Sequence, residues 1–306
     1  MFMQAMPNRR MSEVYRSKTK KNISAGFSAY KNVIVWGTGS SGQTAYSLLG
    51  DRIDCFVDSY YSEDKLLGKD VHKPDYLRGL GSETIVIIAS IAFREIQTWI
   101  SASAPRVAIT TLNDVLTERM PRNSELERLR VDMLVYYNKG WFNSWVTQPQ
   151  LSVNITYRIC RALASGNSLW RRALLIPARI WHTLNCAFFS IEMPITVEAG
   201  AGLQFVHYGG IVIHDNAKLG EFCRIYQNVT IGSDRRGRVP ELGNHVTMWA
   251  GSIAIGGCKL GDYTQVGANS VCTGEIDVSD VSLAGTPARP VGARKPAVKR
   301  KTKLSK

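Results

Sequence analysis

The chain has 306 residues, of which 44% are hydrophobic and 21% charged, a length and composition that suit a globular protein of two domains. Its net charge of +13 comes from the two ends: residues 1–31 carry seven Lys or Arg and one acid, and residues 290–306 carry seven Lys or Arg and no acid. Neither end interleaves aromatic residues with charge as a base-stacking surface does, so we expect basic, disordered tails and no nucleic-acid partner.

Six cysteines are scattered without a Cys-x-x-Cys pair or a histidine at ligand spacing, which predicts buried thiols and no metal site. The first residues lack the continuous apolar core of a signal peptide, so we expect a cytoplasmic protein. The most apolar long segment, 173–195, contains Pro177, Arg179 and His182 and is a poor spanning helix. An amphipathic helix on a membrane surface stays open there, and with it contact with a lipid-linked glycan.

Residues 32–115 alternate as strand–helix–strand units do. The apolar strand NVIVW leads into GTGSSG and a helical segment, and IDCFVD and ETIVIIAS read as further strands. The spacing Gly37-x-Gly39-x-x-Gly42 falls where glycines let backbone N–H groups approach a phosphate, and Asp58 falls near the position of a ribose-binding carboxylate. We expect a Rossmann-like domain with a candidate nucleotide site, the alternative being that the glycines only pack the helix on the sheet. The unit is short for NAD chemistry.

Residues 116–193 read as a helical connector. SELERLRVDMLVYY and TYRICRALA carry apolar residues at three- and four-residue steps. Their basic and aromatic side chains are typical of packing surfaces, so we assign no chemistry to this segment.

The second half of the chain repeats every six residues. An aliphatic or small apolar residue recurs at each sixth position from Ile213 to Ile231, and again from Leu242 to Val278. Small residues follow four positions later, at Cys223, Val229, Val246, Ser252, Cys258, Thr264 and Ser270. A period of six matches neither a helix nor a flat strand, but it matches one side of a triangular coil with one aliphatic residue pointing inward. The repeat predicts a left-handed parallel β-helix over 194–289.

The repeat is interrupted once. Eleven steps separate Ile231 from Leu242 where six would suffice, so SDRRGRVPE must leave the coil. A loop that leaves a regular coil is expected to cover a substrate or to bridge subunits.

Three stretches of the second half resemble a known family. HYGGIVIHDNAKLGEFCRIYQNVTIG, LGDYTQVGANSV and LAGTPARPVG resemble the serine acetyltransferase branch of the hexapeptide acyltransferases, which includes O-acetyltransferases of bacterial polysaccharide loci. The resemblance covers roughly residues 155–292. The domain order also resembles bacterial acetyltransferases that modify nucleotide-activated amino-sugars. The family implies homotrimers with acetyl-CoA in the groove between neighbouring β-helices.

The same resemblance implies roles for individual residues. His207, in FVHYGG, falls on the family's catalytic histidine, and Glu192, in IEMP, falls where these enzymes keep a carboxylate that orients it. Acetyl-CoA would lie near Gly251, Ser252, Ala268 and Asn269, with Arg289 near its phosphates.

Acetyl transfer from a thioester needs a base of near-neutral pKa to take the proton of the incoming hydroxyl or amine, and imidazole supplies one. A carboxylate on the far ring nitrogen fixes the tautomer, and backbone N–H groups of the coil can hold the developing oxyanion. The reaction requires no metal. We expect His214 to be an outward or packing side chain and His245 to lie at a solvated corner. His207 alone is a catalytic candidate, with a structural role as its alternative.

Three departures from the serine-specific pattern bear on the acceptor. The family places an acid directly before the histidine, whereas this chain has Val206, and RRGRVPEL lacks the family's loop histidine. The large helical N-terminal domain is also replaced. These departures favour a sugar or glycan over serine. Arg235, Arg236 and Arg238 would suit an anionic acceptor, although a solvated basic loop explains them too.

Three functions therefore stay open. The first is an acetyl-CoA-dependent acetyltransferase that O-acetylates a sugar or glycan in bacterial polysaccharide biosynthesis by direct transfer. The second is a serine O-acetyltransferase of cysteine biosynthesis. The third is a non-catalytic trimeric scaffold that binds a nucleotide-sugar.

Overall fold

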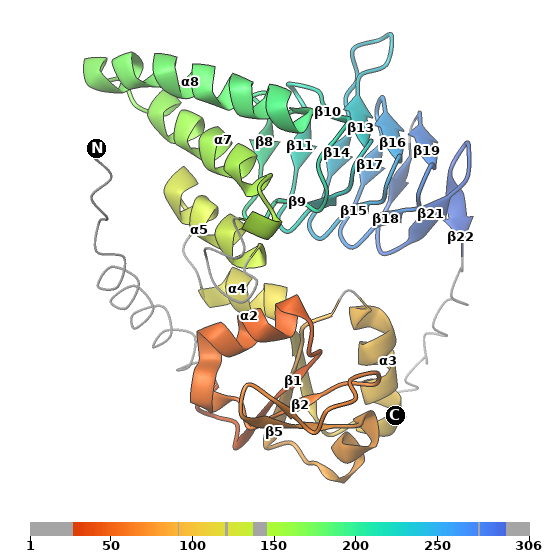
Figure 1. Ribbon diagram of the computed structural model, residues 1–306. Coiled ribbons are helices and arrows are strands. Elements are labelled where there is room, and N and C mark those ends of the chain that lie inside the picture. Colours follow the sequence, from red (N-terminus) through yellow and green to blue (C-terminus); the bar gives the residue numbers. More distant parts are fainter. Residues whose placement is uncertain (1–26, 91, 120–121, 137–145, 275, 292–306) are drawn as a thin grey trace, which may run out of the picture. The chain divides into compact units, whose positions relative to one another are not determined.

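The computed structural model describes residues 27–90, 92–119, 122–136, 146–274 and 276–291 (Figure 1). The chain divides into two compact units, residues 1–149 and 150–306. Among the described helices, none combines the length and the hydropathy that a membrane span requires.

The first unit contains a six-stranded sheet in the order β3-β4-β2-β1-β5-β6. Its strands are β1 (Asn32–Trp36), β2 (Cys55–Val57), β3 (Lys65–Leu66), β4 (Lys69–His72), β5 (Thr84–Ile88) and β6 (Ala108–Thr111). All neighbouring pairs are parallel except the β3–β4 hairpin. The helices are α2 (Ser40–Leu49), α3 (Phe93–Ser103), α4 (Leu112–Arg119) and α5 (Glu125–Val135), with short 3₁₀ turns at Gly50–Arg52 and Pro74–Gly79.

After Asn32 and Thr84 at the starts of β1 and β5, the central strands β1, β2 and β5 are apolar because both faces of a parallel sheet are covered. Every residue of β2 and β5 is buried. Trp36 of β1 packs edge-to-face on Trp99 of α3, with ring centroids 5.4 Å apart. The strand–helix–strand alternation expected over 32–115 is therefore present, with α2 between β1 and β2 and α3 between β5 and β6.

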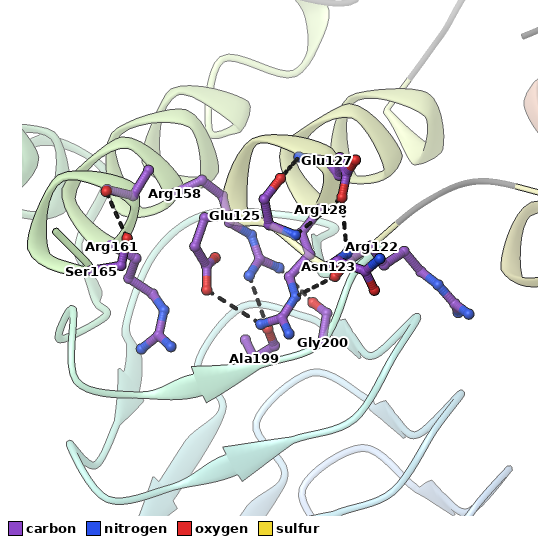
Figure 2. A network of polar contacts seen from close by, with 12 residues as sticks. Arg122, Asn123, Glu125, Glu127, Arg128, Arg158, Arg161, Ser165, Ala199 and Gly200 are labelled. Carbon is purple, nitrogen blue, oxygen red and sulfur yellow. Dashed lines mark hydrogen bonds and ion pairs between the residues drawn. The ribbon is translucent and has the colours of Figure 1, made fainter.

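The helix α5 begins with a capping box at Ser124 and Glu127, the arrangement in which each residue binds the other's backbone N–H. Arg128 pairs with Glu125 one turn earlier, at 3.2 Å (Figure 2). The segment predicted as a single connector thus supplies α5 to the first unit, and α7 (Leu151–Ala164) and α8 (Leu169–Phe189) to the second.

The second unit is a three-sided coil of parallel strands that follows α7 and α8 (Figure 1). Its first side is β7 (Ile191–Glu192), β10 (Ile211–Ile213), β13 (Thr230–Gly232), β16 (Ile253–Ile255) and β19 (Val271–Thr273). Its second side is β8 (Glu198–Ala199), β11 (Lys218–Leu219), β14 (Glu241–Leu242), β17 (Lys259–Leu260) and β20 (Asp277–Val278). Its third side is β9 (Gln204–Phe205), β12 (Arg224–Ile225), β15 (Thr247–Met248), β18 (Gln265–Val266), β21 (Ser282–Ala284) and an antiparallel last strand, β22 (Arg289–Val291).

The six-residue period is confirmed as the spacing between inward-pointing residues. On the third side Phe205, Ile225, Met248 and Val266 are in register and fully buried, as they stack coil upon coil. The interruption is confirmed as well, since Leu219 pairs directly with Leu242 and residues 233–240 leave the coil. The left-handed sense of winding stays a prediction.

Glycine follows an inward residue in the second-side corners because neighbouring coils touch there. A Cβ on Gly220 would lie 2.4 Å from the carbonyl carbon of Gly243 in the next coil. No real Cβ approaches backbone so closely, so only glycine fits this column.

The helix α7 covers the open edge of the first coil with side-chain donors. The Tyr157 hydroxyl donates to the carbonyl of Val197 at 2.6 Å. The Arg158 guanidinium donates to the carbonyls of Ala199 and Gly200 (Figure 2). Further donors to the coil's carbonyls are Gln150, Asn154 and Arg161. Buried carbonyls need partners, and here a helix supplies what a preceding coil would otherwise give.

Candidate functional site

His207 lies on a corner of the coil that is wider than its equivalents. Seven steps separate Phe205 from Val212 in the first coil, whereas only five separate their register partners, Ile225 and Thr230, in the second. The later coils also take five steps. Two extra residues therefore lift His207 out of the regular backbone path, and its side chain is exposed.

Aromatic rings surround the widened corner. The ring of Tyr226, in the next coil, meets the His207 imidazole edge-to-face at 5.9 Å, and Trp249 lies 4.6 Å beyond Tyr226. On the other flank Tyr208 packs on Phe189 at the end of α8, with centroids 5.4 Å apart. The amide of Gly209 donates to the Phe189 carbonyl at 3.0 Å, so α8 anchors the loop that carries the histidine.

Gln227 was not singled out from the sequence. It lies three residues before Thr230, the register partner of Val212, so it occupies the corner position that Gly209 holds in the first coil, two residues after His207. The Gln227 side-chain oxygen is buried and has no hydrogen-bond partner among the described residues. A buried unpaired acceptor is costly, and an incoming N–H or O–H donor would relieve that cost. The six-residue repeat does not set Gln227 apart from its neighbours, so only the burial of its side-chain oxygen in the structure identifies it as a candidate.

Glu192 lies on β7 and is exposed, with its backbone opposite Val212 of β10. Within the part of the chain that the structure describes, no hydrogen bond or ion pair joins Glu192 to His207. The orienting role of this carboxylate stays a prediction.

The predicted cofactor residues follow the His207 corner down the coil. Ala268 and Gly251 occupy this corner in later coils, Ala268 exposed and Gly251 half-buried. Gly251 and Asn269 have positive φ, +69° and +54°, and a Cβ on Gly251 would lie 2.2 Å from the Asn269 side-chain oxygen. The left-handed backbone at both positions, and the close contact at Gly251, therefore explain why these residues are glycine and asparagine even without a bound cofactor.

Ser252 and Arg289 differ from these corner residues. Ser252 points into the coil and is fully buried, and its hydroxyl has no partner among the described residues. Arg289 is exposed on β22 and donates to the carbonyl of Ala288 at 3.2 Å. The structure therefore brings three of the five predicted cofactor residues to the surface of one corner, buries Ser252 inside the coil, and places Arg289 on the last strand.

The arginines of the excursion 233–240 do not act alike. Both carboxylate oxygens of Asp234 accept hydrogen bonds from the same loop. One accepts from the amides of Arg236 and Arg238, and the other accepts from the Arg238 guanidinium at 2.8 Å. Burial acts to raise the pKa of the Asp234 carboxyl, but the hydrogen bonds from Arg238 and Arg236 lower it below its ordinary value. Arg235 and Arg236 are exposed, whereas Arg238 is held in the loop's own ion pair.

The glycine-rich loop of the first unit is held by Asp58. One oxygen of Asp58 accepts from the amide and hydroxyl of Thr38, and the other accepts from the amides of Tyr60 and Tyr61. Partial burial acts to raise the pKa of this carboxyl, but these hydrogen bonds lower it. Asp58 therefore has a structural task whether or not a ribose binds.

The structure does not require glycine equally at the three positions of this loop. A Cβ on Gly42 would lie 1.9 Å from the Gly37 carbonyl oxygen, and one on Gly37 would lie 2.5 Å from the Ala89 oxygen. A Cβ on Gly39 would meet nothing within 4 Å. Packing explains Gly37 and Gly42 but not Gly39.

The remaining histidines of the second unit lie in packed or paired settings. His245 is at an outward corner as expected, but it is half-buried in a stack between Phe222 and Tyr263, 5.3 and 4.5 Å away. His214 pairs with Asp215 at 2.9 Å. Stacking explains His245 without any catalytic task.

The thiols in the coil are free, buried and weakly acidic. Burial raises the pKa of Cys223 and Cys272 to about 12. The thiolate is the reactive form of cysteine, so these residues act as small packing groups.

Comparison with known proteins links the chain to one enzyme class. No family model matches it. It is 30% identical over 134 residues to the serine acetyltransferase of Synechococcus elongatus, 43% of this chain and 54% of that protein. It is 28% identical over 155 residues to that of Helicobacter pylori, 49% of this chain and 86% of that protein. The chain is thus similar to serine acetyltransferases. It spans about half the length of the Synechococcus protein.

Solved structures of the same name are also similar. A Brucella abortus serine acetyltransferase is 22% identical with a TM-score of 0.47, covering 55% of this chain and 68% of that one. A serine acetyltransferase solved in complex with CoA is 23% identical with a TM-score of 0.47, covering 66% and 76%.

Proposed function

We propose that the chain is an acetyl-CoA-dependent O-acetyltransferase with His207 as general base. The observation that carries the proposal is the exposed imidazole on a corner widened by two residues, above a column of small and amide residues in the following coils. Curated relatives named as serine acetyltransferases support it.

In the proposed reaction His207 takes the proton of the acceptor hydroxyl as its oxygen attacks the thioester carbonyl. The carbon–sulfur bond then breaks, CoA leaves as the thiolate, and the imidazolium returns the proton to that sulfur. Glu192 would orient the ring, and the buried Gln227 oxygen would accept a hydrogen bond from a bound substrate. Acetyl-CoA would follow the column of Gly251, Ser252, Ala268 and Asn269, with Arg289 near its phosphates.

The acceptor that the relatives favour is serine, because each of those compared carries that name. Serine is therefore the better supported acceptor, and a sugar or glycan is the second candidate. Two observations support a sugar or glycan as the acceptor. Val206, not an acid, precedes His207, and the exposed Arg235 and Arg236 suit an anionic acceptor.

Two further parts of the proposal concern assembly and the first unit. The active form would be a homotrimer with the cofactor between neighbouring coils. The first unit would be a Rossmann-like domain that binds a nucleotide or nucleotide-sugar at Gly37, Gly39, Gly42 and Asp58. Gly39 supports this, since packing does not require it and it caps α2 without a side chain.

The test measures CoA release with a thiol reagent, using L-serine and a panel of sugars as acceptors. We expect His207→Ala to lower kcat by about 10²-fold or more, the usual contribution of a general base. His214→Ala, which removes an imidazole already paired with Asp215, serves as the control and should retain activity. Equal rates for His207→Ala and the native chain would disprove the assignment of the base. Absence of acetyl-CoA binding by calorimetry would favour the scaffold.

A further inference from the structure

The helix α8 exposes an unusually large apolar surface. Eight of the sixteen exposed large hydrophobic side chains in the described residues lie on this one helix, and each is at least 51% exposed. This surface, the α8 apolar face, consists of Leu169, Trp170, Leu174, Ile176, Ile180, Trp181, Leu184 and Phe188. Water-facing apolar patches of this size mark an interaction surface.

The helix is attached to the rest of its unit by its opposite side. His182 and Phe189 are its buried residues, and Asn185 accepts a hydrogen bond from Ser152 of α7 at 2.8 Å. The α8 apolar face therefore points away from α7 and from the coil. Its 21 residues give a strip about 30 Å long.

The charge around this face has one sign. From residue 146 to residue 191 the chain contains no Asp or Glu. Arg172 and Arg179 are exposed and seven residues apart, so they lie along one margin of the apolar face. Arg171 lies over the ring of Trp170, 5.3 Å from its centroid.

We propose that the α8 apolar face docks on an anionic membrane surface, with the helix lying in the plane of the headgroups. Tryptophan suits the boundary between acyl chains and headgroups, and arginines at the margin suit anionic headgroups. The apolar positions occupy too wide an arc for a coiled-coil seam, which needs only two positions in seven. A contact between two copies through this face would also bring unneutralised arginines together. This docking does not depend on acetyl transfer.

Docking would bring the candidate site close to the membrane. Phe188 of the apolar face packs on Phe189 at 4.9 Å, and Phe189 packs on Tyr208, the residue after His207. The same helix end thus contacts the proposed membrane and the loop of the proposed base.

The experiment is co-sedimentation of the full chain with vesicles of phosphatidylcholine, alone or with about one-third phosphatidylglycerol. We expect binding to the anionic vesicles that weakens as salt rises. Trp181→Glu and the double variant Arg172→Glu/Arg179→Glu should each weaken it by about tenfold or more. These side chains are exposed, so the variants should keep the native circular dichroism spectrum.

The control is Leu126→Glu, which places the same charge at an exposed apolar position in the first unit. It should bind as the native chain does. Unchanged binding by Trp181→Glu would assign the affinity to the basic ends of the chain and overturn the proposal. Loss of a native oligomer in Trp181→Glu, seen by sedimentation velocity, would assign the face to self-association and overturn it too.

Discussion

His182 is a buried imidazole held by two polar partners. Its Nε2 donates to the Met193 carbonyl at 2.8 Å, and its Nδ1 lies 2.9 Å from the Thr156 hydroxyl. The Cys186 thiol and the Tyr157 ring also face it. Burial lowers the pKa of His182 below its ordinary value of 6.5, and the bond to Met193 only partly opposes this.

The pH dependence of stability follows from that shift. Below about pH 6.5 the unfolded chain binds a proton at His182 that the folded chain does not, so the free energy of unfolding falls as the pH falls. His182→Gln keeps a donor and an acceptor but does not titrate. Chemical unfolding between pH 5 and 8 should show a smaller loss of stability for the variant. Parallel curves for the two proteins would contradict this assignment.

At the same scale, the sequence predicted only part of the candidate site. His207 could be placed because the motif around it is local. Gln227 could not, since its significance comes from an unpaired buried oxygen that only the stacking of coils creates. The two extra residues before Val212 could not be predicted either, because they break the six-residue period between Phe205 and Ile213 and so separate Ala199 and Phe205 from the later repeats.

Among the elements, α7 has the clearest energetic role. Arg158→Met should lower the free energy of unfolding of the second unit by about 3 kcal/mol, because an unpaired buried polar group costs roughly 1–3 kcal/mol and this change leaves two carbonyls without this donor. Urea unfolding followed by circular dichroism measures the effect. Lys218→Met, which removes an exposed cation from β11, is the matched control. Equal losses in both variants would show that α7 does not cap the coil through Arg158.

The helices α7 and α8 could be predicted as helices from their periodicity, but not their tasks. The donors on α7 and at its N-cap follow a helical spacing, at Gln150, Asn154, Tyr157, Arg158 and Arg161. Their acceptors are backbone carbonyls, which carry no mark in a sequence. From the sequence alone, such a row of polar side chains is typical of a solvated or packing surface, because the strand edge that it covers cannot be seen.

For the whole molecule, the first side of the coil offers a surface for assembly. Its outward positions Val212, Ile253, Ile255 and Val271 are apolar and belong to three of its coils, with Thr230 between Val212 and Ile253. Ile253→Glu should convert the proposed trimer to monomers, since a charge buried without a partner is strongly unfavourable at an interface. Sedimentation velocity measures the change, with Lys259→Glu on the second side as control. A monomeric native chain would refute the trimer.

The division into two units could be predicted from the change from strand–helix alternation to a six-residue repeat. The exact assignment of the helices between them could not, because helix periodicity tells which face is apolar but not which neighbour covers it. The capping of the coil by α7 supplies that information for the second unit.

The two ends of the coil have a consequence for polymerisation. A stack of parallel strands can grow without limit, since each edge is a template for an identical one. Here the side-chain donors of α7 occupy the edge of the first coil. At the opposite end of the third side, β22 runs antiparallel to β21 and places Pro290 opposite Leu283. Proline has no N–H to offer a further strand. These features therefore oppose the end-to-end association of coils from separate chains.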